Sequence, residues 1–445
     1  MVVKNIIIFF FILEYVLFAT ELDIDMLKQS DRVEYVVPKD GTSYFEYSKT
    51  SDNEIVSPNS YDRFELDPKI KFYNSKKGVM AIVPLAENYY YFNGSFFDTI
   101  KIKGECKNCT VAISDKTLFE KEDNIEIGKF EKKLSLIRLN NKIDFRKLKY
   151  IIFFAPKEQD IDIKKIVFLH TPKEPQKIEN GIWIWSSKDV DIDKIKRNKI
   201  KTVYLQVDDG FMEAAELLSR NGIDVYALDG DPNYIFNDEK LMINIKKVLM
   251  ANQIKNIVKG FQIDIEPHIL KGFNLHKDEY IKRLIALSER INFKLKENHM
   301  KFSIVMPFWY ETVYVDKKSA AYDLIDIADE VVLMSYRTDP NEVLKISADK
   351  LAYAQADGKK VKLGIELMPI ADEHHFVYDA NDVSKCKDIA SFPKKCKEIK
   401  PIFEFDTRGE TISFYNQKDR IKDLTSKKIK YNSFNGFVYH HIGGL

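Results

Sequence analysis

Apolar and polar positions follow one pattern from about residue 181 to the C-terminus. Short apolar runs alternate there with longer stretches whose apolar residues recur every three or four positions. Short apolar runs are typical of buried parallel strands, and the longer stretches are typical of amphipathic helices. The candidate strands are 182–186, 202–207, 224–228, 260–265, 302–307, 330–336, 362–368 and 436–441. The amphipathic stretches that separate most of them are 210–221, 240–258, 277–298, 319–328 and 348–356.

This alternation predicts an α/β fold, a closed (β/α)8 TIM barrel over residues 180–445. Eight strands with helices between them over about 265 residues match the usual size of such a barrel. An open doubly wound sheet is the alternative. It is disfavoured because no Gly-rich phosphate-binding turn follows the first strand.

The pattern before the barrel is different. Residues 69–172 contain short β-rich runs with turn residues between them and no long helical stretch, which predicts an all-β sandwich of the jelly-roll kind. An aromatic-rich run at 89–97 is either a carbohydrate-binding surface of this domain or part of its core. Residues 21–68 are polar with little periodicity, so we expect a poorly structured or extended segment.

Residues 1–20 resemble a signal peptide, with Lys4 ahead of an apolar run at 5–19. A run of about 15 residues is short for a membrane span, which needs about 20. We therefore expect an exported protein, periplasmic or secreted, with an uncleaved N-terminal anchor as the alternative.

Four cysteines fit an exported protein with disulfide bonds. Cys106 and Cys109 are three residues apart, and Cys386 and Cys396 are ten residues apart. Four cysteines allow three pairings, of which the two local bonds are the simplest. A zinc site would need both pairs to meet across two domains.

The charge balance excludes some partners. Lys and Arg number 69 against 68 Asp and Glu, so no basic excess favours nucleic acid or an anionic membrane. No metal-ligand motif, phosphate loop or nucleophile elbow occurs, so we expect no metal and no cofactor.

Carboxylates and aromatic residues gather where the predicted strands end. In a parallel barrel these carboxyl ends carry the active site. Carboxylates for proton transfer beside flat aromatic rings suit a sugar-binding cleft, so we expect a polysaccharide or glycan as the partner. The candidates for substrate binding are Trp183, Trp185, Asp208, Asp209, Asp229, Trp309, Tyr310, Tyr336 and His440.

The fourth strand is the most informative. Side chains alternate along a strand, so Gln262, Asp264 and Glu266 point the same way, into the barrel mouth. Two neighbouring carboxylates raise the pKa of one of them, which suits a general acid near neutral pH. A buried salt bridge to a barrel lysine or arginine is the structural alternative.

Residues 259–266, KGFQIDIE, resemble the D-G-x-D-x-D-x-E signature of family 18 glycoside hydrolases, the chitinases and their relatives. The resemblance implies that Glu266 is the proton donor and Asp264 its assisting carboxylate. Met334 and Tyr336 resemble the M-x-Y of that family, whose tyrosine helps position the substrate's acetamido group. Lys259 and Gln262 stand where the family has aspartates.

A second resemblance involves Glu266 and Pro267, which look like the acid/base signature of retaining clan A glycosidases. These enzymes carry a nucleophilic glutamate after the seventh strand, where this chain has Glu366. The catalytic candidates are therefore Glu266 with either Asp264 or Glu366. The barrel as a whole also resembles uncharacterised bacterial glycoside-hydrolase-like barrels.

The sequence thus predicts an exported glycoside hydrolase that acts on a polysaccharide or cell-surface glycan by carboxylate acid/base catalysis. The alternative is a catalytically inactive barrel that binds carbohydrate, because two signature aspartates are replaced. A structural envelope protein without glycan affinity is a third interpretation.

Overall fold

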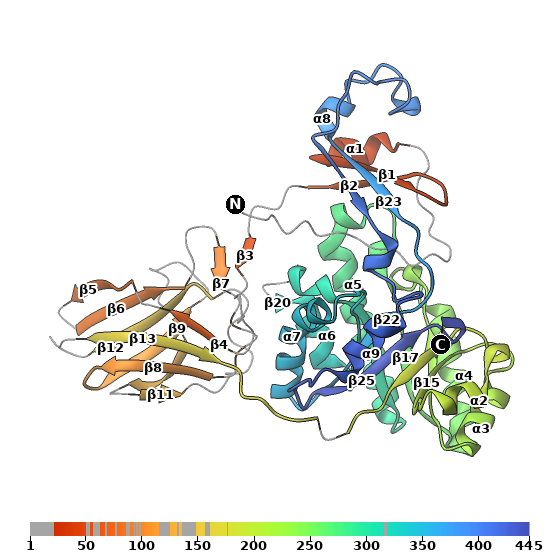
Figure 1. Cartoon of the computed structure of the whole chain (residues 1–445), viewed down its shortest axis with the longest axis horizontal. Coiled ribbons are helices and arrows are strands. Elements are labelled where there is room, and N and C mark those ends of the chain that lie inside the picture. Colours follow the sequence, from red (N-terminus) through yellow and green to blue (C-terminus); the bar gives the residue numbers. More distant parts are fainter. Residues whose placement is uncertain are drawn as a thin grey trace.

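The computed structural model describes residues 22–444 except 50–53, 57–62, 67–68, 76–77, 86–89, 93, 95–96, 98, 115–124, 131–132, 136–147, 156–160, 176 and 316–317. The predicted signal peptide therefore lies outside the described residues. Eight parallel strands form a closed barrel, which confirms the predicted barrel architecture (Figure 1). In order, they are β14 (Gly181–Ile184), β15 (Thr202–Gln206), β16 (Asp224–Asp229), β17 (Val258–Ile263), β18 (Lys301–Pro307), β21 (Glu330–Met334), β22 (Lys360–Glu366) and β25 (Phe434–His440).

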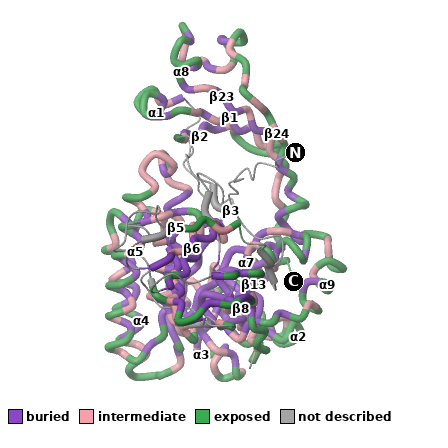
Figure 2. Tube along the Cα trace, turned by 90° about the vertical axis from the view of Figure 1, so that its left-hand side faces the viewer, coloured by how far each residue is buried: buried purple, intermediate pink, exposed green. Residues whose placement is uncertain are grey.

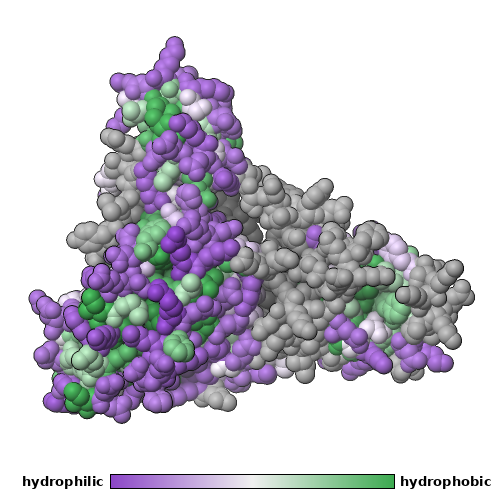
Figure 3. Space-filling model, turned by 180° about the vertical axis from the view of Figure 1, so that it is seen from behind, coloured by the Kyte–Doolittle hydropathy of each residue, from purple (hydrophilic) through white to green (hydrophobic). Residues whose placement is uncertain are grey.

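Helices surround these strands on the outside of the barrel (Figure 1). Figure 2 shows buried residues concentrated inside this shell, because each helix turns an apolar stripe towards the strands. On the solvent side, Figure 3 shows a largely hydrophilic surface with separate apolar patches. The helices are α2 (Ile192–Arg197), α3 (Phe211–Arg220), α4 (Glu239–Lys255), α5 (Phe273–Glu297), α6 (Ala320–Ile327), α7 (Pro340–Ala356) and α9 (Lys418–Ser426).

The start of β17 is set by the end of α4. Asn256 adopts the left-handed conformation that ends the helix. The Asn252 side chain then accepts hydrogen bonds from the backbone N–H groups of Ile257 and Val258, and it donates one to the Val258 carbonyl. Strand β17 therefore begins at Val258, two residues before the predicted strand, and ends at Ile263.

A polar network fills part of the barrel interior. Trp183 Nε1 donates to Gln262 Oε1 at 2.7 Å, and Gln262 Nε2 donates to Ser303 Oγ at 2.8 Å. Glu330 continues the network, since it accepts a 2.5 Å hydrogen bond from the Tyr204 hydroxyl. Gln262 and Ser303 are completely buried, so these bonds replace hydration that the polar groups lose on folding.

Two separate antiparallel sheets precede the barrel (Figure 1). Their packing into a jelly-roll sandwich stays a prediction. Within the aromatic run 89–97, Phe92 and Phe97 are buried and contact Phe168, while Tyr89 lies outside the described residues. The five-stranded sheet has the order β10 (Ile125–Phe130), β9 (Cys109–Ser114), β12 (Tyr150–Ala155), β6 (Gly78–Pro84), β5 (Lys71–Ser75). The four-stranded sheet has the order β11 (Lys133–Ser135), β8 (Thr99–Glu105), β13 (Asp162–Leu169), β4 (Arg63–Leu66).

A third sheet brings together two segments that are far apart in the sequence. Strands β1 (Arg32–Pro38) and β2 (Tyr44–Ser48) pair with β23 (Glu373–Asp379) and β24 (Phe403–Thr407), which are inserted between the seventh and eighth barrel strands. Figure 1 shows this sheet above the barrel, with α1 (Ile24–Gln29) and α8 (Ala380–Val383) beside it. Part of the segment expected to be poorly structured or extended is therefore paired.

Both local disulfide bonds form, Cys106–Cys109 and Cys386–Cys396. The second one closes the loop between β23 and β24, and both of its cysteines are buried in the apolar cluster under the third sheet. Across the described ranges, no helix has both the length and the apolar character to cross a membrane.

An ion pair links β1 to β23 in the third sheet. His375 Nδ1 lies 2.5 Å from Glu34 Oε1, and His375 Nε2 lies 3.5 Å from Glu373 Oε2. Glu46 lies near them on β2, and burial, followed by the charge of Glu34, raises the pKa of its carboxyl well above the usual range. Burial alone would lower the pKa of His375, but its hydrogen bonds to Glu34 and Glu373 and their charges raise it to about 9.

This raised pKa makes the stability of the third sheet depend on pH. The folded pKa of His375 exceeds the unfolded value of about 6.5, so its contribution is complete below pH 6.5 and is lost as the pH rises through about 9. We expect the wild type to lose roughly 3 kcal/mol across this window and His375→Asn to lose much less. Thermal unfolding from pH 6 to 10 measures the difference; equal slopes for both proteins would contradict it.

The barrel network predicts a cost for removing its central amide. Gln262→Leu leaves Trp183 Nε1 and Ser303 without this partner inside the barrel, so we expect a loss of about 2–4 kcal/mol in the free energy of unfolding. Lys259→Leu is the matched control, because Lys259 lies on the same strand but is exposed. Urea unfolding compares the two variants, and similar small losses would contradict the role assigned to Gln262.

Candidate active site

The two acidic residues of the predicted signature follow directly after β17. The backbone N–H of Asp264 donates to the Asp229 carbonyl at 3.0 Å, which extends the pairing of β16 and β17 by one residue. Gly230 makes this approach possible, since a Cβ atom there would lie 2.1 Å from the Asp264 carbonyl oxygen. Glu266 comes just before the short helix η5 (Pro267–Ile269).

Asp264 is half-buried, and one of its carboxylate oxygens is shut off from solvent. Its Oδ1 is inaccessible and has no hydrogen-bond partner. Burial, and then the negative charge of Glu266, raise the pKa of the Asp264 carboxyl well above its usual range. No lysine or arginine of the described chain forms an ion pair with Asp264, so the salt bridge considered as the structural alternative does not form there.

Glu266 is the accessible member, with 24% of its side chain exposed. Its Oε2 lies 3.1 Å from Nε2 of His268, whose side chain is buried. His268 Nδ1 lies 3.5 Å from the Tyr310 hydroxyl, and the imidazole packs edge-on against Trp309. Glu266 is therefore held from one side by a buried imidazole and reaches solvent from the other.

Glu366 has a different environment. It is fully buried, and both of its carboxylate oxygens accept hydrogen bonds from the protein. Oε1 accepts from the backbone N–H of Met368 at 2.6 Å, and Oε2 lies 2.7 Å from Nδ1 of His440. The His440 ring lies edge-on to Trp183 and Trp185, with centroid distances of 6.0 and 6.2 Å.

Tyr336 lies close enough to these carboxylates for their charges to affect its hydroxyl. Burial raises the pKa of Tyr336, and the charges of Glu366, Asp264 and Glu266 raise it further. Burial and the charges of Glu266 and Asp264 raise the pKa of Tyr310 in the same way. Residues from the fourth, fifth, sixth and seventh strands thus meet at one end of the barrel, as its topology requires.

Several predicted rim residues are buried. Trp183, Trp309 and Tyr310 are 1%, 6% and 0% exposed, so their rings are not open faces on which a sugar could stack. Trp183 instead forms part of the interior network through Gln262. Trp185 is half-buried, and its Nε1 has no hydrogen-bond partner.

The predicted aspartates mostly organise loops. Asp208 accepts hydrogen bonds from the backbone N–H groups of Ser187 and Gly210. Asp229 is buried and accepts from Asn244 Nδ2 at 2.8 Å and from the Gly230 N–H at 2.9 Å. Asp209 remains exposed.

His268 was not among the predicted catalytic or substrate-binding residues. It lies in the helix η5, beyond the end of β17, so the alternation of side chains along a strand does not indicate its contact with Glu266.

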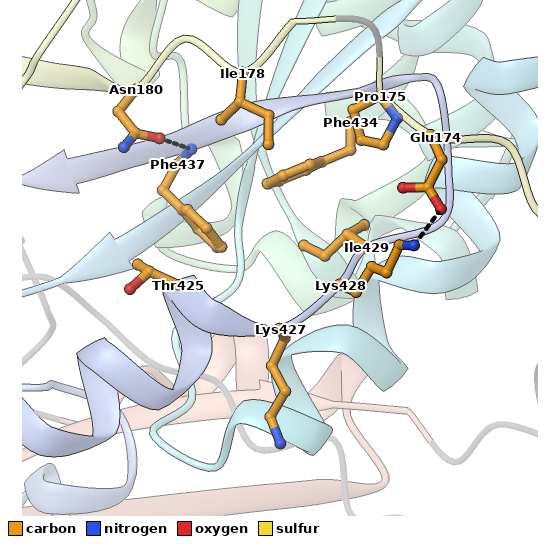
Figure 4. A pocket seen from close by; sticks show the side chains of 10 residues that line it. All are labelled: Glu174, Pro175, Ile178, Asn180, Thr425, Lys427, Lys428, Ile429, Phe434 and Phe437. Carbon is orange, nitrogen blue, oxygen red and sulfur yellow. Dashed lines mark hydrogen bonds and ion pairs between the residues drawn. The ribbon is translucent and has the colours of Figure 1, made fainter.

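A hollow at the other end of the barrel has a different character (Figure 4). It lies between the segment that precedes β14, the end of α9 and the start of β25. The Glu174 carboxylate pairs with Lys428 at 3.0 Å. The residues that line the hollow are Glu174, Pro175, Ile178, Asn180, Thr425, Lys427, Lys428, Ile429, Phe434 and Phe437. None of the predicted site residues lines it.

Within the described parts of the chain, no cluster of histidine, cysteine or acidic side chains is suited to a metal ion.

Neither a family model nor a curated protein matches the sequence. Similar solved structures include a chitinase from Chromobacterium violaceum, at 10% identity and a TM-score of 0.36 over 60% of this chain and 95% of that one. The spore cortex-lytic enzyme SleL of Bacillus megaterium is 12% identical, with a TM-score of 0.34 over 65% of this chain and 76% of its own. A class V chitinase from Nicotiana tobaccum is 12% identical, with a TM-score of 0.35 over 61% and 95%.

Two of these structures are chitinases, the kind of enzyme whose signature residues 259–266 resemble.

Proposed function

We propose that the protein is an exported glycoside hydrolase that cleaves a glycan containing N-acetylated sugars, with Glu266 as the general acid/base. The observation that carries the proposal is the asymmetry of the acidic pair. Asp264 has a raised pKa and one inaccessible oxygen without a hydrogen-bond partner, and it stands beside a Glu266 that solvent can reach. Different environments for two neighbouring carboxyls are what separate acid and base roles require.

Asp264 is the better partner for Glu266 than Glu366. A nucleophilic glutamate needs an oxygen that the substrate can reach, and Glu366 is fully buried, with its two oxygens accepting hydrogen bonds from Met368 and His440. Asp264 Oδ1 has no such bond. The substrate-assisted mechanism therefore fits these residues better than the two-glutamate mechanism.

In this mechanism Glu266 donates its proton to the glycosidic oxygen as the bond to the anomeric carbon breaks. The substrate's acetamido oxygen attacks that carbon, while Asp264 accepts a hydrogen bond from the acetamido N–H. Glu266 then takes a proton from the water that opens the cyclic intermediate. We assign the Tyr336 hydroxyl, whose pKa is raised by the charges of all three carboxylates, to a contact with the acetamido oxygen.

A carbohydrate-binding protein without activity is the second candidate function. Gln262 stands in place of a signature aspartate, and it is committed to hydrogen bonds with Trp183 and Ser303. An amide cannot exchange a proton with Asp264. We further propose that the antiparallel sheets form a jelly-roll sandwich that binds the same glycan.

Glu266→Gln tests the proposed function. The amide keeps the shape of the side chain but cannot transfer a proton, so we expect turnover to fall at least about a hundredfold. Release of reducing ends from chitin oligosaccharides and from peptidoglycan measures this loss. Glu279→Gln is the control, because Glu279 is exposed on α5 and pairs only with Arg283.

Unchanged turnover in Glu266→Gln would contradict the assignment. Wild-type binding of either glycan without product release would instead support the non-catalytic candidate.

Asp264→Asn tests the buried carboxyl without any substrate. The folded pKa of Asp264 is raised, so its ionisation destabilises the wild type as the pH rises from about 3.9 through the folded pKa. Asparagine avoids this cost, so we expect the variant to unfold a few degrees above the wild type at pH 8. This difference in unfolding temperature should vanish near pH 4. If the variant instead loses stability relative to the wild type between pH 4 and pH 8, the raised pKa is contradicted.

A further inference from the structure

Glu366 and His440 occupy matching positions at the carboxyl ends of neighbouring strands. Strands β22 and β25 pair in parallel, and the register sets Glu366 directly beside His440. Their side chains meet at 2.7 Å between Oε2 and Nδ1. The closure of the barrel therefore builds this pair from residues that are 74 positions apart in sequence.

The hydrogen bonds of Glu366 determine which nitrogen of His440 carries the proton. An ionised carboxylate only accepts hydrogen bonds, and Oε1 already accepts from the Met368 N–H. Oε2 must therefore accept from Nδ1–H of His440. When the imidazole is neutral, Nε2 is left with a lone pair and acts as an acceptor.

The surroundings of His440 leave Nε2 available. The described hydrogen bonds and ion pairs of this side chain all involve Nδ1, and 13% of the side chain is exposed. Two indole rings limit its movement, since Trp183 and Trp185 lie edge-on to the imidazole. Trp185 also brings an unpartnered Nε1–H to the same side of the mouth.

We infer that Glu366 is a positioning residue that holds His440 as the Nδ1–H tautomer, so that Nε2 accepts a hydrogen bond from a sugar hydroxyl of the bound glycan. The inference rests on the proposed function for the presence of a glycan at this mouth. It assigns Glu366 a role through His440 instead of a nucleophilic one. A hydroxyl beside Trp185 can donate to Nε2 and accept from the indole N–H.

Glu366→Gln reverses the direction of the hydrogen bond between residue 366 and His440 Nδ1. The amide oxygen keeps the bond from the Met368 N–H, so the NH2 group faces Nδ1 and donates to it. His440 must then carry its proton on Nε2. The substitution changes neither size nor burial, so a structural role alone predicts no change of tautomer.

Long-range 1H–15N correlation spectra of the 15N-labelled full chain at pH 8 measure the tautomer directly. His440→Gln assigns the His440 signals, and Glu410→Gln, on an exposed side chain, is the control. We expect the Nδ1–H tautomer in the wild type and in Glu410→Gln, and the Nε2–H tautomer in Glu366→Gln. A wild type with the Nε2–H tautomer, or a Glu366→Gln variant with the wild-type tautomer, overturns the positioning role.

Added chitotetraose tests the contact with sugar. We expect the His440 Nε2 signal of the wild type to shift on titration, and an Nε2 signal that stays unmoved at millimolar chitotetraose overturns the assigned contact. The tautomer does not depend on turnover. An active Glu266→Gln variant with the expected tautomers would therefore refute the proposed function and leave the positioning role standing.

Discussion

The desolvation of a single carboxyl group is the constraint on which the candidate site depends. Closing the parallel sheet brings the ends of all eight strands to one mouth, where the chain after β17 shuts Oδ1 of Asp264 off from solvent. A buried charge without a partner is costly, and the charge of Glu266 adds to that cost. Asp264 therefore holds its proton more tightly than an exposed aspartate does.

Three acidic residues at this mouth have three different environments. Asp264 is half-buried with one inaccessible, unpartnered oxygen, Glu266 is accessible and pairs with His268, and Glu366 is buried with both oxygens bonded. The chemistry open to each follows from these contacts, since residue type alone would make the two glutamates equivalent. Proton transfer suits Glu266, and orientation of a neighbour suits Glu366.

The barrel could be predicted from the sequence because each strand and helix carries its own apolar periodicity. The alternation that predicted a common direction for Gln262, Asp264 and Glu266 covers only Gln262, because β17 ends at Ile263. Positions that depend on distant partners could not be predicted. The pairing of β1 with β23 joins residues more than 300 positions apart, so no local pattern indicates it.

The sequence also did not predict how deeply the aromatic side chains are buried. Trp183 was expected on the rim, but it lies inside the barrel because Gln262 supplies a partner for its N–H. The ends of β17 and β21 fall two residues before their predicted ends, which places Asp264 and Tyr336 in the loops beyond the strands.

The pKa of Asp264 is the quantity that tests this account most directly. In protein labelled with 13C at the aspartate carboxyls, a pH titration by NMR follows the signal that is missing from Asp264→Asn. The account predicts a midpoint well above that of an ordinary aspartate, and a lower midpoint once Glu266→Gln removes the neighbouring charge. An ordinary midpoint, unaffected by Glu266→Gln, would contradict it.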